Sequence, residues 1–410
     1  MLLFQPESVV WRRNAVLVAS LFFILIGTGS IYFIVVALKE MAAEFDWPRT
    51  VPSTAYALQY MGAGVGGIFM GWCFDRRGMA IPAFVGASMI GAGAILTSFI
   101  TNQWQLLFVY GVMLGFFGRS ALFGPLTANI TQWFEHNKSF AVGVVGSGQG
   151  LSGMLWPPIF QYLMASVGWR QAALIYGLFA LATMLPLAFI LRWIPPVLAS
   201  NQAEAHLQGG IFRTYRALQL ALCVASVGCC VAMSLPLAHL VSHVSDLGYD
   251  LARGAEVLSV ALGFSIISSL FGVGFLGRRY GGLRTLLVFS ATQATLLAAL
   301  GFVDTLLGFY VAAALFGLGY GGILPCYPLI VRELMPRSES GRRTGLIILC
   351  AGIGMALGSW LGGYVFDLTG GYQSAFLIGV AFNVANLVVI VGLIFHMQRE
   401  KGDDYNAKMF

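Results

Sequence analysis

Charged side chains are scarce in this chain of 410 residues, since only 10% of it is Asp, Glu, Lys or Arg. An ordinary soluble domain carries about 25% charged residues. Hydrophobic residues make up 58% of the sequence, and no soluble core could bury so much apolar surface. The composition therefore excludes a soluble protein and predicts a chain that lies in a membrane.

Several motifs that carry chemistry are also missing. The six cysteines show no metal-ligand spacing, so we interpret them as small core hydrophobes and expect no metal site. The glycine runs lack the strand and the Lys of a phosphate-binding loop, so no ATP site or other cofactor is expected. A membrane enzyme would need a polar constellation at one depth, such as paired carboxylates, and the sequence offers none.

Long apolar stretches are what the sequence has instead. A helix needs about 20 mostly apolar residues to cross a bilayer, and the first such stretch is too long for a removable signal peptide. Twelve stretches meet the requirement: Asn14–Leu38, Val51–Cys73, Ala80–Ile100, Gln105–Trp133, Ser139–Val167, Gln171–Arg192, Tyr215–Ser242, Leu251–Leu276, Leu283–Phe302, Leu306–Val331, Thr344–Phe366 and Tyr372–His396.

The second half of the chain repeats the first. Arg76-Arg77 and Arg278-Arg279 close two apolar stretches 202 residues apart, and the same offset aligns residues 169–174 with 371–376. The repeat predicts an all-α membrane protein with twelve transmembrane helices in two pseudo-symmetric six-helix bundles, residues 1–192 and 215–410. Residues 193–214 hold the only long polar interruption between two spans, and we expect them to form a cytoplasmic linker.

The basic residues behind the net charge of +6 lie mostly in the loops on one side of the predicted spans. Loops on one side of the predicted spans hold 18 Lys and Arg residues together with the termini, and loops on the other side hold four: Lys39, Arg49, Arg170 and Arg253. The positive-inside rule therefore places both termini in the cytoplasm of a multi-pass protein of the cytoplasmic membrane. This distribution excludes a nucleic-acid footprint and leaves membrane lipids as the surroundings.

Several segments together resemble the monocarboxylate and oxalate/formate branch of the major facilitator superfamily. They are the cytoplasmic loop at 71–78, Glu44-Phe45-Asp46-Trp47-Pro48-Arg49, Trp133-Phe134, Ser147-Gly148-Gln149-Gly150, Trp156-Pro157-Pro158, Gly168-Trp169-Arg170 and Phe366-Asp367-Leu368-Thr369-Gly370-Gly371-Tyr372. The resemblance implies a secondary transporter, with a monomeric functional unit, that moves a small organic anion by alternating access. Proton symport, exchange, facilitated diffusion and a non-carboxylate solute stay open, and a sensor on the same fold is less favoured because the cytoplasmic parts are short.

One position departs from that family pattern. Members of this branch that carry small carboxylates often have an arginine deep in the eighth span, and the matching position here is Leu270. The resemblance therefore leaves the substrate less predictable.

Arg119 is the one charge deep inside a predicted span. It lies about midway along the fourth span, where a buried charge costs at least about 2.5 to 3.5 kcal/mol. No Asp or Glu lies at a similar depth in any predicted span. We therefore expect Arg119 to bind an anionic substrate between the halves, and the alternative is a structural arginine bonded to backbone carbonyls.

Five more side chains could complete a substrate site, and packing in the bundle is at least as probable for each aromatic one. We expect Tyr32 to follow a kink at Gly27-Thr28-Gly29, and we expect the helix to break at Pro325-Cys326-Tyr327-Pro328. The five candidates are Tyr32, Gln149, Trp156, Tyr320 and Tyr327.

Two other groups carry secondary predictions. The loop Gly71-Trp72-Cys73-Phe74-Asp75-Arg76-Arg77-Gly78 and its echo with Arg278-Arg279 are interpreted as a cytoplasmic gate, although they could merely fix topology. His239 and His243 share one face of the seventh span. Packing is our default for this pair, and proton coupling is the alternative because histidine titrates near neutral pH.

Overall fold

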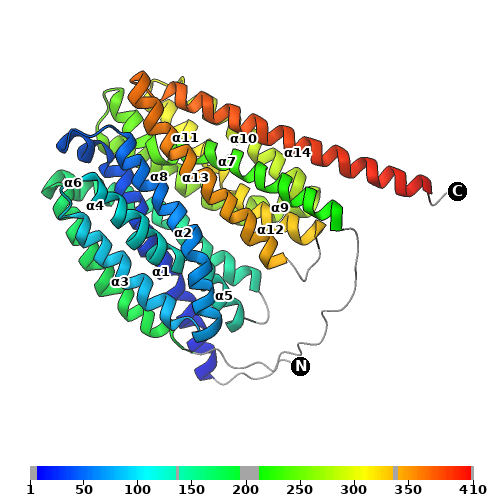
Figure 1. Cartoon of the computed structure of the whole chain (residues 1–410), viewed down its shortest axis with the longest axis horizontal. Coiled ribbons are helices and arrows are strands. Elements are labelled where there is room, and N and C mark those ends of the chain that lie inside the picture. Colours follow the sequence, from blue (N-terminus) through cyan, green and yellow to red (C-terminus); the bar gives the residue numbers. More distant parts are fainter. Residues whose placement is uncertain (1–6, 135–137, 194–211, 336–339, 408–410) are drawn as a thin grey trace. The chain divides into compact units, whose positions relative to one another are not determined.

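The computed structural model describes residues 7–134, 138–193, 212–335 and 340–407, and every element in these ranges is helical (Figure 1). Helix bounds often disagree with the expected spans by several residues. The elements are α1 (Glu7–Glu44), α2 (Thr50–Arg77), α3 (Ala80–Thr97), α4 (Gln103–Phe108), η1 (Val109–Gly118), η2 (Arg119–Ala121), α5 (Gly124–Trp133), α6 (Lys138–Leu191), α7 (Phe212–Asp246), α8 (Leu251–Ile267), η3 (Ser268–Gly272), α9 (Val273–Tyr280), α10 (Gly282–Leu300), α11 (Leu306–Tyr320), α12 (Ile323–Leu334), α13 (Ser340–Thr369) and α14 (Gln373–Ala407).

Ten helical stretches of the described residues are long and apolar enough to cross a membrane. One of them, Ala141–Leu191, contains Gly168 with a left-handed backbone (φ 79°), which divides α6 into the predicted fifth and sixth spans. Helix α2 is not among the ten, but its 28 residues supply the predicted second span. The all-helical membrane architecture is therefore confirmed.

The chain forms two compact units. Unit 1 holds Met1–Gln202 and Ala238–Gly263, and unit 2 holds Ala203–Leu237 and Phe264–Phe410. The end of α7 and most of α8 thus pack with unit 1, so the compact units differ from the halves 1–192 and 215–410 that the repeat predicts. Those halves stay a prediction, and most of the predicted linker, residues 193–214, lies outside the described residues.

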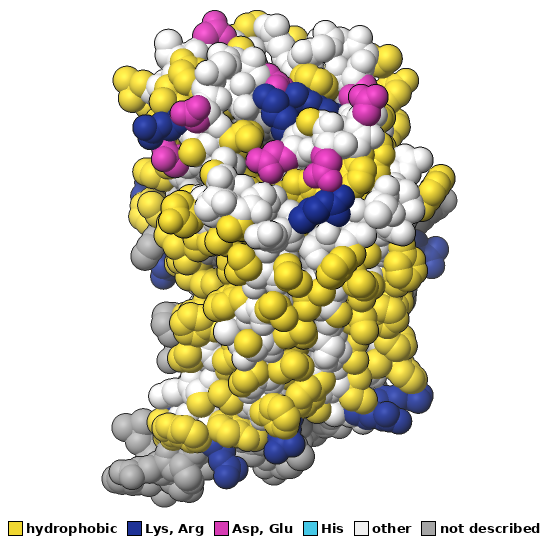
Figure 2. Space-filling view, turned by 90° about the vertical axis from the view of Figure 1, so that its left-hand side faces the viewer, with side chains coloured by type: hydrophobic (Ala, Val, Ile, Leu, Met, Phe, Trp, Pro, Cys, Tyr) yellow, Lys and Arg dark blue, Asp and Glu magenta, His cyan; other side chains and the backbone are white. Residues whose placement is uncertain are grey.

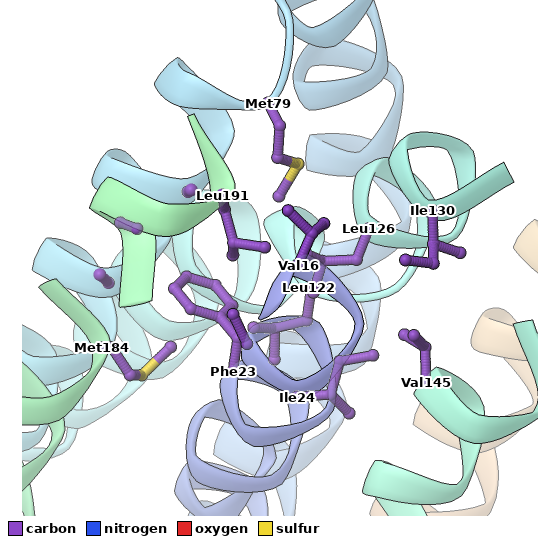
Figure 3. Packing of buried hydrophobic residues seen from close by; sticks show 14 of the residues in the cluster. Val16, Phe23, Ile24, Met79, Leu122, Leu126, Ile130, Val145, Met184 and Leu191 are labelled. Carbon is purple, nitrogen blue, oxygen red and sulfur yellow. The ribbon is translucent and has the colours of Figure 1, made fainter. Parts of the chain in front are cut away.

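An apolar core fills unit 1 where α1 meets α6. Figure 3 shows Phe23 and Val16 of α1 packed beside Met184 and Leu191 of α6, with Leu122 next to them. Each of these side chains is at most 2% exposed. In lipid, dispersion contacts of this kind hold helices together, because burial from water supplies no driving force between them.

Glycines allow the backbones of α2 and η1 to come into direct contact. A Cβ atom on Gly62 would overlap the carbonyl oxygen of Gly111, and one on Gly66 would overlap the carbonyl oxygen of Phe116. From the opposite side, a Cβ atom on Gly115 would come within 2.9 Å of the Gln59 carbonyl oxygen. Only glycine fits where two helix backbones approach so closely.

Amide side chains join α7, α10 and α14 inside unit 2. Asn383 donates to the Ser290 carbonyl and to Gln293 Oε1, each at 3.0 Å, and Gln293 donates to the Cys229 carbonyl at 3.2 Å. Asn386 donates to Asn383 Oδ1 at 2.8 Å. The three amides are at most 1% exposed, so these bonds tie the helices of unit 2 together in its interior.

One predicted helix irregularity is corrected. The tenth span breaks at Gly321 and Gly322, between α11 and α12, and not at Pro325 to Pro328. Pro325 lies in the first turn of α12, where a missing N–H costs nothing because the first four amides of a helix have no partner within it.

The first span is one continuous helix through Gly27-Thr28-Gly29, and the kink expected there stays a prediction. Helix α1 continues from Glu7 to Glu44, and a Cβ atom on Gly29 would lie 2.9 Å from Trp156 Nε1 and from Tyr176 Oη. The glycine therefore serves close packing, because it lets these two side chains approach the helix.

Charges lie away from the apolar surface. On the face drawn in Figure 2, hydrophobic side chains form a broad band, acidic side chains gather toward one end together with some Lys and Arg side chains, and further Lys and Arg side chains lie at the other end. This arrangement fits a lipid-embedded surface with polar ends.

The contact between α2 and η1 makes a stability prediction. Gly66→Ala should lower the apparent stability of the purified protein by about 1 to 3 kcal/mol, because overpacking forces backbones apart. Gly67→Ala is the matched control, since a Cβ atom there meets nothing within 4 Å. Thermal unfolding in detergent checks both variants, and equal melting temperatures for the two would contradict the close contact.

Candidate functional site

Arg119 lies at a break in the fourth span. That span is built from α4, then the π-helix η1, then the 3₁₀ turn η2 that begins at Arg119, and then α5. Pro125, in the first turn of α5, suits a helix start after the turn. Short π and 3₁₀ segments inside helices frequently mark functional sites, so the backbone itself singles out the position of this arginine.

The guanidinium of Arg119 lies over an aromatic ring. Its Cζ is 4.6 Å from the ring centroid of Tyr60 on α2, which is within the range of a cation–π interaction. The Tyr60 ring lies 5.1 Å from that of Tyr56, which precedes it by about one turn of α2. Tyr56 also interacts electrostatically with Arg119 and with Tyr32 of α1. Four side chains of unit 1 thus gather from three spans, and we call them the Arg119 cluster: Tyr32, Tyr56, Tyr60 and Arg119.

No carboxylate of the described residues forms an ion pair with Arg119. Four ion pairs are present there, and their cations are Lys39, Arg49, Arg170 and Arg253. Arg119 as a whole residue is only partly buried.

Neighbouring contacts hold the Arg119 cluster in place. Gln59, next to Tyr60, is fully buried and donates to Ser30 Oγ of α1 at 2.8 Å, which ties α2 to α1. A Cβ atom on Gly153 of α6 would lie 2.6 Å from the Tyr32 hydroxyl, so the missing side chain makes room for this phenol. The cluster is therefore supported by α1, α2 and α6 as well as by the broken fourth span.

The two candidates on α6 differ in their surroundings. Gln149 is half-buried. Trp156 is 7% exposed and donates from Nε1 to the Leu25 carbonyl at 2.9 Å, while its ring stacks on Phe160 and meets Tyr176 edge-on. Its polar atom is already bonded within unit 1, so Trp156 serves packing in this structure.

The two tenth-span candidates belong to unit 2. Tyr320 is 9% exposed, and its ring lies 5.3 Å from that of Phe316. Tyr327 is 1% exposed, and its hydroxyl lies 3.2 Å from Cys229 Sγ.

Leu270 is the eighth-span residue that the sequence resemblance matches with an arginine. Its side chain is 43% exposed and lies in the π-helix η3. The eighth span is thus irregular at the position that the sequence resemblance matches with an arginine.

The predicted gate residues end α2 and α9. Arg76 lies 4.4 Å from the Trp72 ring centroid and Arg279 lies 5.6 Å from that of Tyr280. Arg77 and Arg278 are exposed at the same helix ends. The side chain of Asp75 lies outside the described part of the chain, so its gate role stays a prediction.

The two histidines of α7 are buried in unit 1. His239 is 0% exposed and His243 is 8% exposed. No group of three or more potential metal ligands forms among the described side chains. Burial favours the packing role, and the coupling role stays a prediction.

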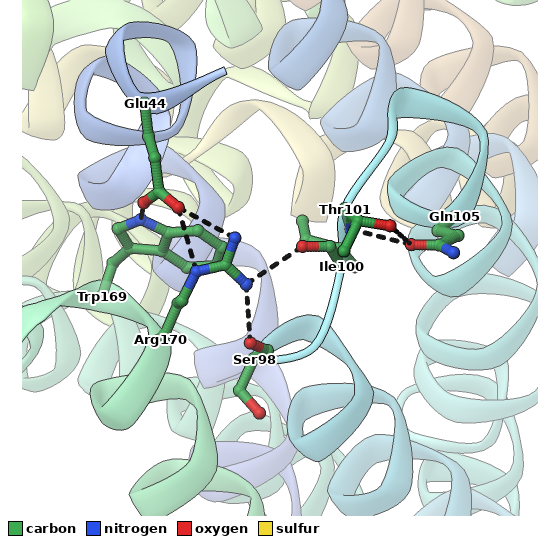
Figure 4. A network of polar contacts seen from close by, with 7 residues as sticks. All are labelled: Glu44, Ser98, Ile100, Thr101, Gln105, Trp169 and Arg170. Atoms are coloured by element: carbon green, nitrogen blue, oxygen red, sulfur yellow. Dashed lines mark hydrogen bonds and ion pairs between the residues drawn. The ribbon is translucent and has the colours of Figure 1, made fainter.

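A polar network closes one end of unit 1 (Figure 4). Arg170 donates to Glu44 of α1 and to the carbonyls of Ser98 and Ile100, at distances from 2.8 to 3.0 Å, and Trp169 donates to the same Glu44 carboxylate. Together with the three other ion pairs, this network satisfies all four basic residues that the sequence places outside.

The sequence reasoning missed Tyr56 and Tyr60. They stand at i and i+4 in the second span, so they share one helix face. That spacing could have been noticed, but only the structure shows that this face meets Arg119.

Comparisons with known proteins agree with this architecture. The family model of the Major Facilitator Superfamily matches residues 18–327 and 220–409. Monocarboxylate transporter 13 of Bos taurus is 28% identical, with 95% of this chain and 91% of the relative covered. Monocarboxylate transporter 11 of Mus musculus is 26% identical, with 87% of this chain and 82% of the relative covered.

A solved structure shows the same fold. The crystal structure of a mutant of the nucleoside transporter NupG superposes with a TM-score of 0.71 at 12% identity, and it covers 93% of this chain and 99% of that chain. At so low an identity the similarity concerns the fold alone.

The packing role of Trp156 makes a prediction. Trp156→Phe keeps an aromatic ring but removes the indole donor, so it should lower stability by about 1 to 3 kcal/mol. Trp104→Phe is the control, because Trp104 is 72% exposed. Thermal unfolding without any ligand is the measurement, and an unchanged melting temperature for Trp156→Phe would return this residue to the list of ligand contacts.

Proposed function

This chain belongs to the Major Facilitator Superfamily, and from that premise we propose that it is a secondary transporter that moves a small organic anion by alternating access. The observation that carries the proposal is Arg119, a cation within a membrane span whose guanidinium lies over the Tyr60 ring. A ring face attracts a cation but does not neutralise it. The guanidinium therefore retains the capacity to bind an anion through two parallel hydrogen bonds.

The chemistry of the Arg119 cluster suits a small carboxylate. The guanidinium supplies planar donors, and the phenols of Tyr32, Tyr56 and Tyr60 can donate further hydrogen bonds. Two of the relatives are named monocarboxylate transporters, and we extend that substrate class to this chain as part of the proposal. Gln149 is a proposed additional contact.

The transport cycle is proposed on the two sequence halves, residues 1–192 and 215–410. Asp75, Arg76, Arg77, Arg278 and Arg279 would act at the cytoplasmic gate, with both termini and the linker in the cytoplasm. The functional unit would be a monomer in the cytoplasmic membrane.

Anion transport could be coupled to protons, or it could proceed by exchange or facilitated diffusion. An acidic carrier inside a span is the usual partner of a proton, and the predicted spans hold their acids near the ends. Exchange or facilitated diffusion of the anion fits that distribution. Proton symport would instead rest on His239 and His243.

Arg119 should govern anion affinity. Arg119→Ala is expected to weaken the binding of small carboxylates such as pyruvate by about 30-fold to several thousand-fold, because losing one partner of a buried charge pair costs about 2 to 5 kcal/mol. Arg119→Lys keeps the charge but not the planar fork, so it should retain part of the affinity. Concentration-dependent uptake into proteoliposomes measures both variants, and wild-type affinity and rate for a carboxylate in Arg119→Ala would refute the site.

Tyr60 supplies a matched pair of variants. Tyr60→Phe keeps the ring under the guanidinium, whereas Tyr60→Leu removes it. We expect Tyr60→Leu to weaken carboxylate uptake about threefold to tenfold more than Tyr60→Phe, since a partly desolvated cation–π contact contributes about 1 kcal/mol. Equal affinities for the two variants would show that the ring does not position Arg119.

The pH dependence of uptake distinguishes proton symport from exchange or facilitated diffusion. If the α7 histidines carry protons, replacing both His239 and His243 with Gln should flatten the pH dependence of uptake between about pH 5 and 8, where histidine titrates. An unchanged pH profile in the double variant would assign both residues to packing.

A further inference from the structure

One carboxylate of unit 1 binds two cations from other elements. Asp246 ends α7, and its Oδ1 accepts from Lys39 Nζ at 3.0 Å and from Arg49 Nη2 at 2.8 Å, while its Oδ2 accepts from Arg49 Nη1. Lys39 also donates to Ser245 Oγ at 3.0 Å. Both Asp246 oxygens are thus bonded by side chains that lie about 200 residues earlier in the sequence.

The geometry makes this contact stronger than an ordinary surface ion pair. Arg49 binds the carboxylate through two nitrogens, and such bidentate pairs are short and directional. The exposed fraction is 13% for the Arg49 side chain and 24% for that of Asp246. Partial burial reduces the screening that makes exposed pairs weak.

The contact differs from the other outer ion pairs in what it joins. Glu44 and Arg170 connect α1 with α6, which both belong to the first sequence repeat. Lys39 and Arg49 lie in α1 and directly before α2, whereas Asp246 lies in α7, the first helix of the second repeat. Alternating access moves one repeat against the other, so opening at this end of α1 and α7 requires the Asp246 contacts to break.

We propose that Asp246 is a latch that binds Lys39 and Arg49 and thereby favours the state in which the outer ends of α1 and α7 are held together. The inference deepens the proposed function, because it assumes transport by alternating access. Its test reads conformation without any substrate, so a failure of the latch and a failure of the anion site are distinguishable.

Ser242 offers a reporter position. It lies one helical turn before Asp246 in α7, it is 1% exposed, and Ser242→Cys changes its shape little. A membrane-impermeant maleimide applied from outside should label this cysteine slowly while the latch is closed. The same protein without the Ser242→Cys change gives the background from the native cysteines.

Removing the charge should open the latch. Asp246→Asn is expected to increase the labelling rate at Ser242→Cys about threefold or more, because two partly buried ion pairs are lost together. Lys39→Gln should raise it less, since the Arg49 contact remains. Adding Lys39→Gln to Asp246→Asn should give little further increase, because Lys39 has by then already lost its ion pair with Asp246.

Glu44→Gln is the matched control, since it removes a carboxylate from an ion pair within one repeat. It should leave the labelling rate unchanged, and a monodisperse gel-filtration peak verifies that each variant is folded. An unchanged rate in Asp246→Asn, or an equal rise in Glu44→Gln, would overturn the proposal. If Asp246→Asn does not fold, Lys39→Gln decides the question by the same criterion.

Discussion

A bilayer offers no water to the backbone, and this constraint determines where the chain can be irregular. Each N–H and C=O group must find a partner within the protein, so a lipid-facing segment remains helical. The described residues obey this rule, and the departures from α-helix are short π and 3₁₀ segments such as η1, η2 and η3. The irregularity before Arg119 is sheltered by α2, because Gly62 and Gly66 let that helix lie against the η1 backbone.

The treatment of charge follows from the same constraint. The four basic residues that the sequence predicts to lie outside are all ion-paired, and Asp246 pairs with two of them. Arg119 lies over an aromatic ring, as Arg76 and Arg279 do at the helix ends, but it is the one arginine deep inside a predicted span. The proposal that Arg119 binds an anion rests on this depth and on the absence of an ion pair with any carboxylate of the described residues.

Much of this account could be predicted from the sequence. Hydropathy located the spans, because a helix of fixed rise must match a bilayer of fixed thickness. Arg119 stood out by depth alone, since charge inside a span is costly. The hydropathy of a span and the depth of a charge within it both depend only on the residue types in one stretch of sequence and on the length of that stretch.

The rotation of each helix about its own axis, and the neighbours that it packs against, could not be predicted from the sequence in the same way. Tyr60 faces Arg119 because of how α2 turns against η1, and a single span does not reveal its neighbour. The prolines at 325 and 328 indicated a helix break, but the break lies at Gly321 and Gly322. Pro325 is accepted in the first turn of α12, and Pro328 lies inside that helix without ending it. The Asp246 contacts join residues far apart in sequence, so only the fold brings them together.

The most direct test of the central claim is ligand-induced thermal stabilisation of the purified protein. A panel of small carboxylates and their uncharged methyl esters would be compared on the wild type and on Arg119→Gln, since a bound ligand raises apparent stability by mass action. We expect at least one carboxylate to raise the melting temperature of the wild type, with no effect from its ester and none on Arg119→Gln. Stabilisation of equal size by the ester, or in the variant, would contradict the assignment of Arg119 as the anion site.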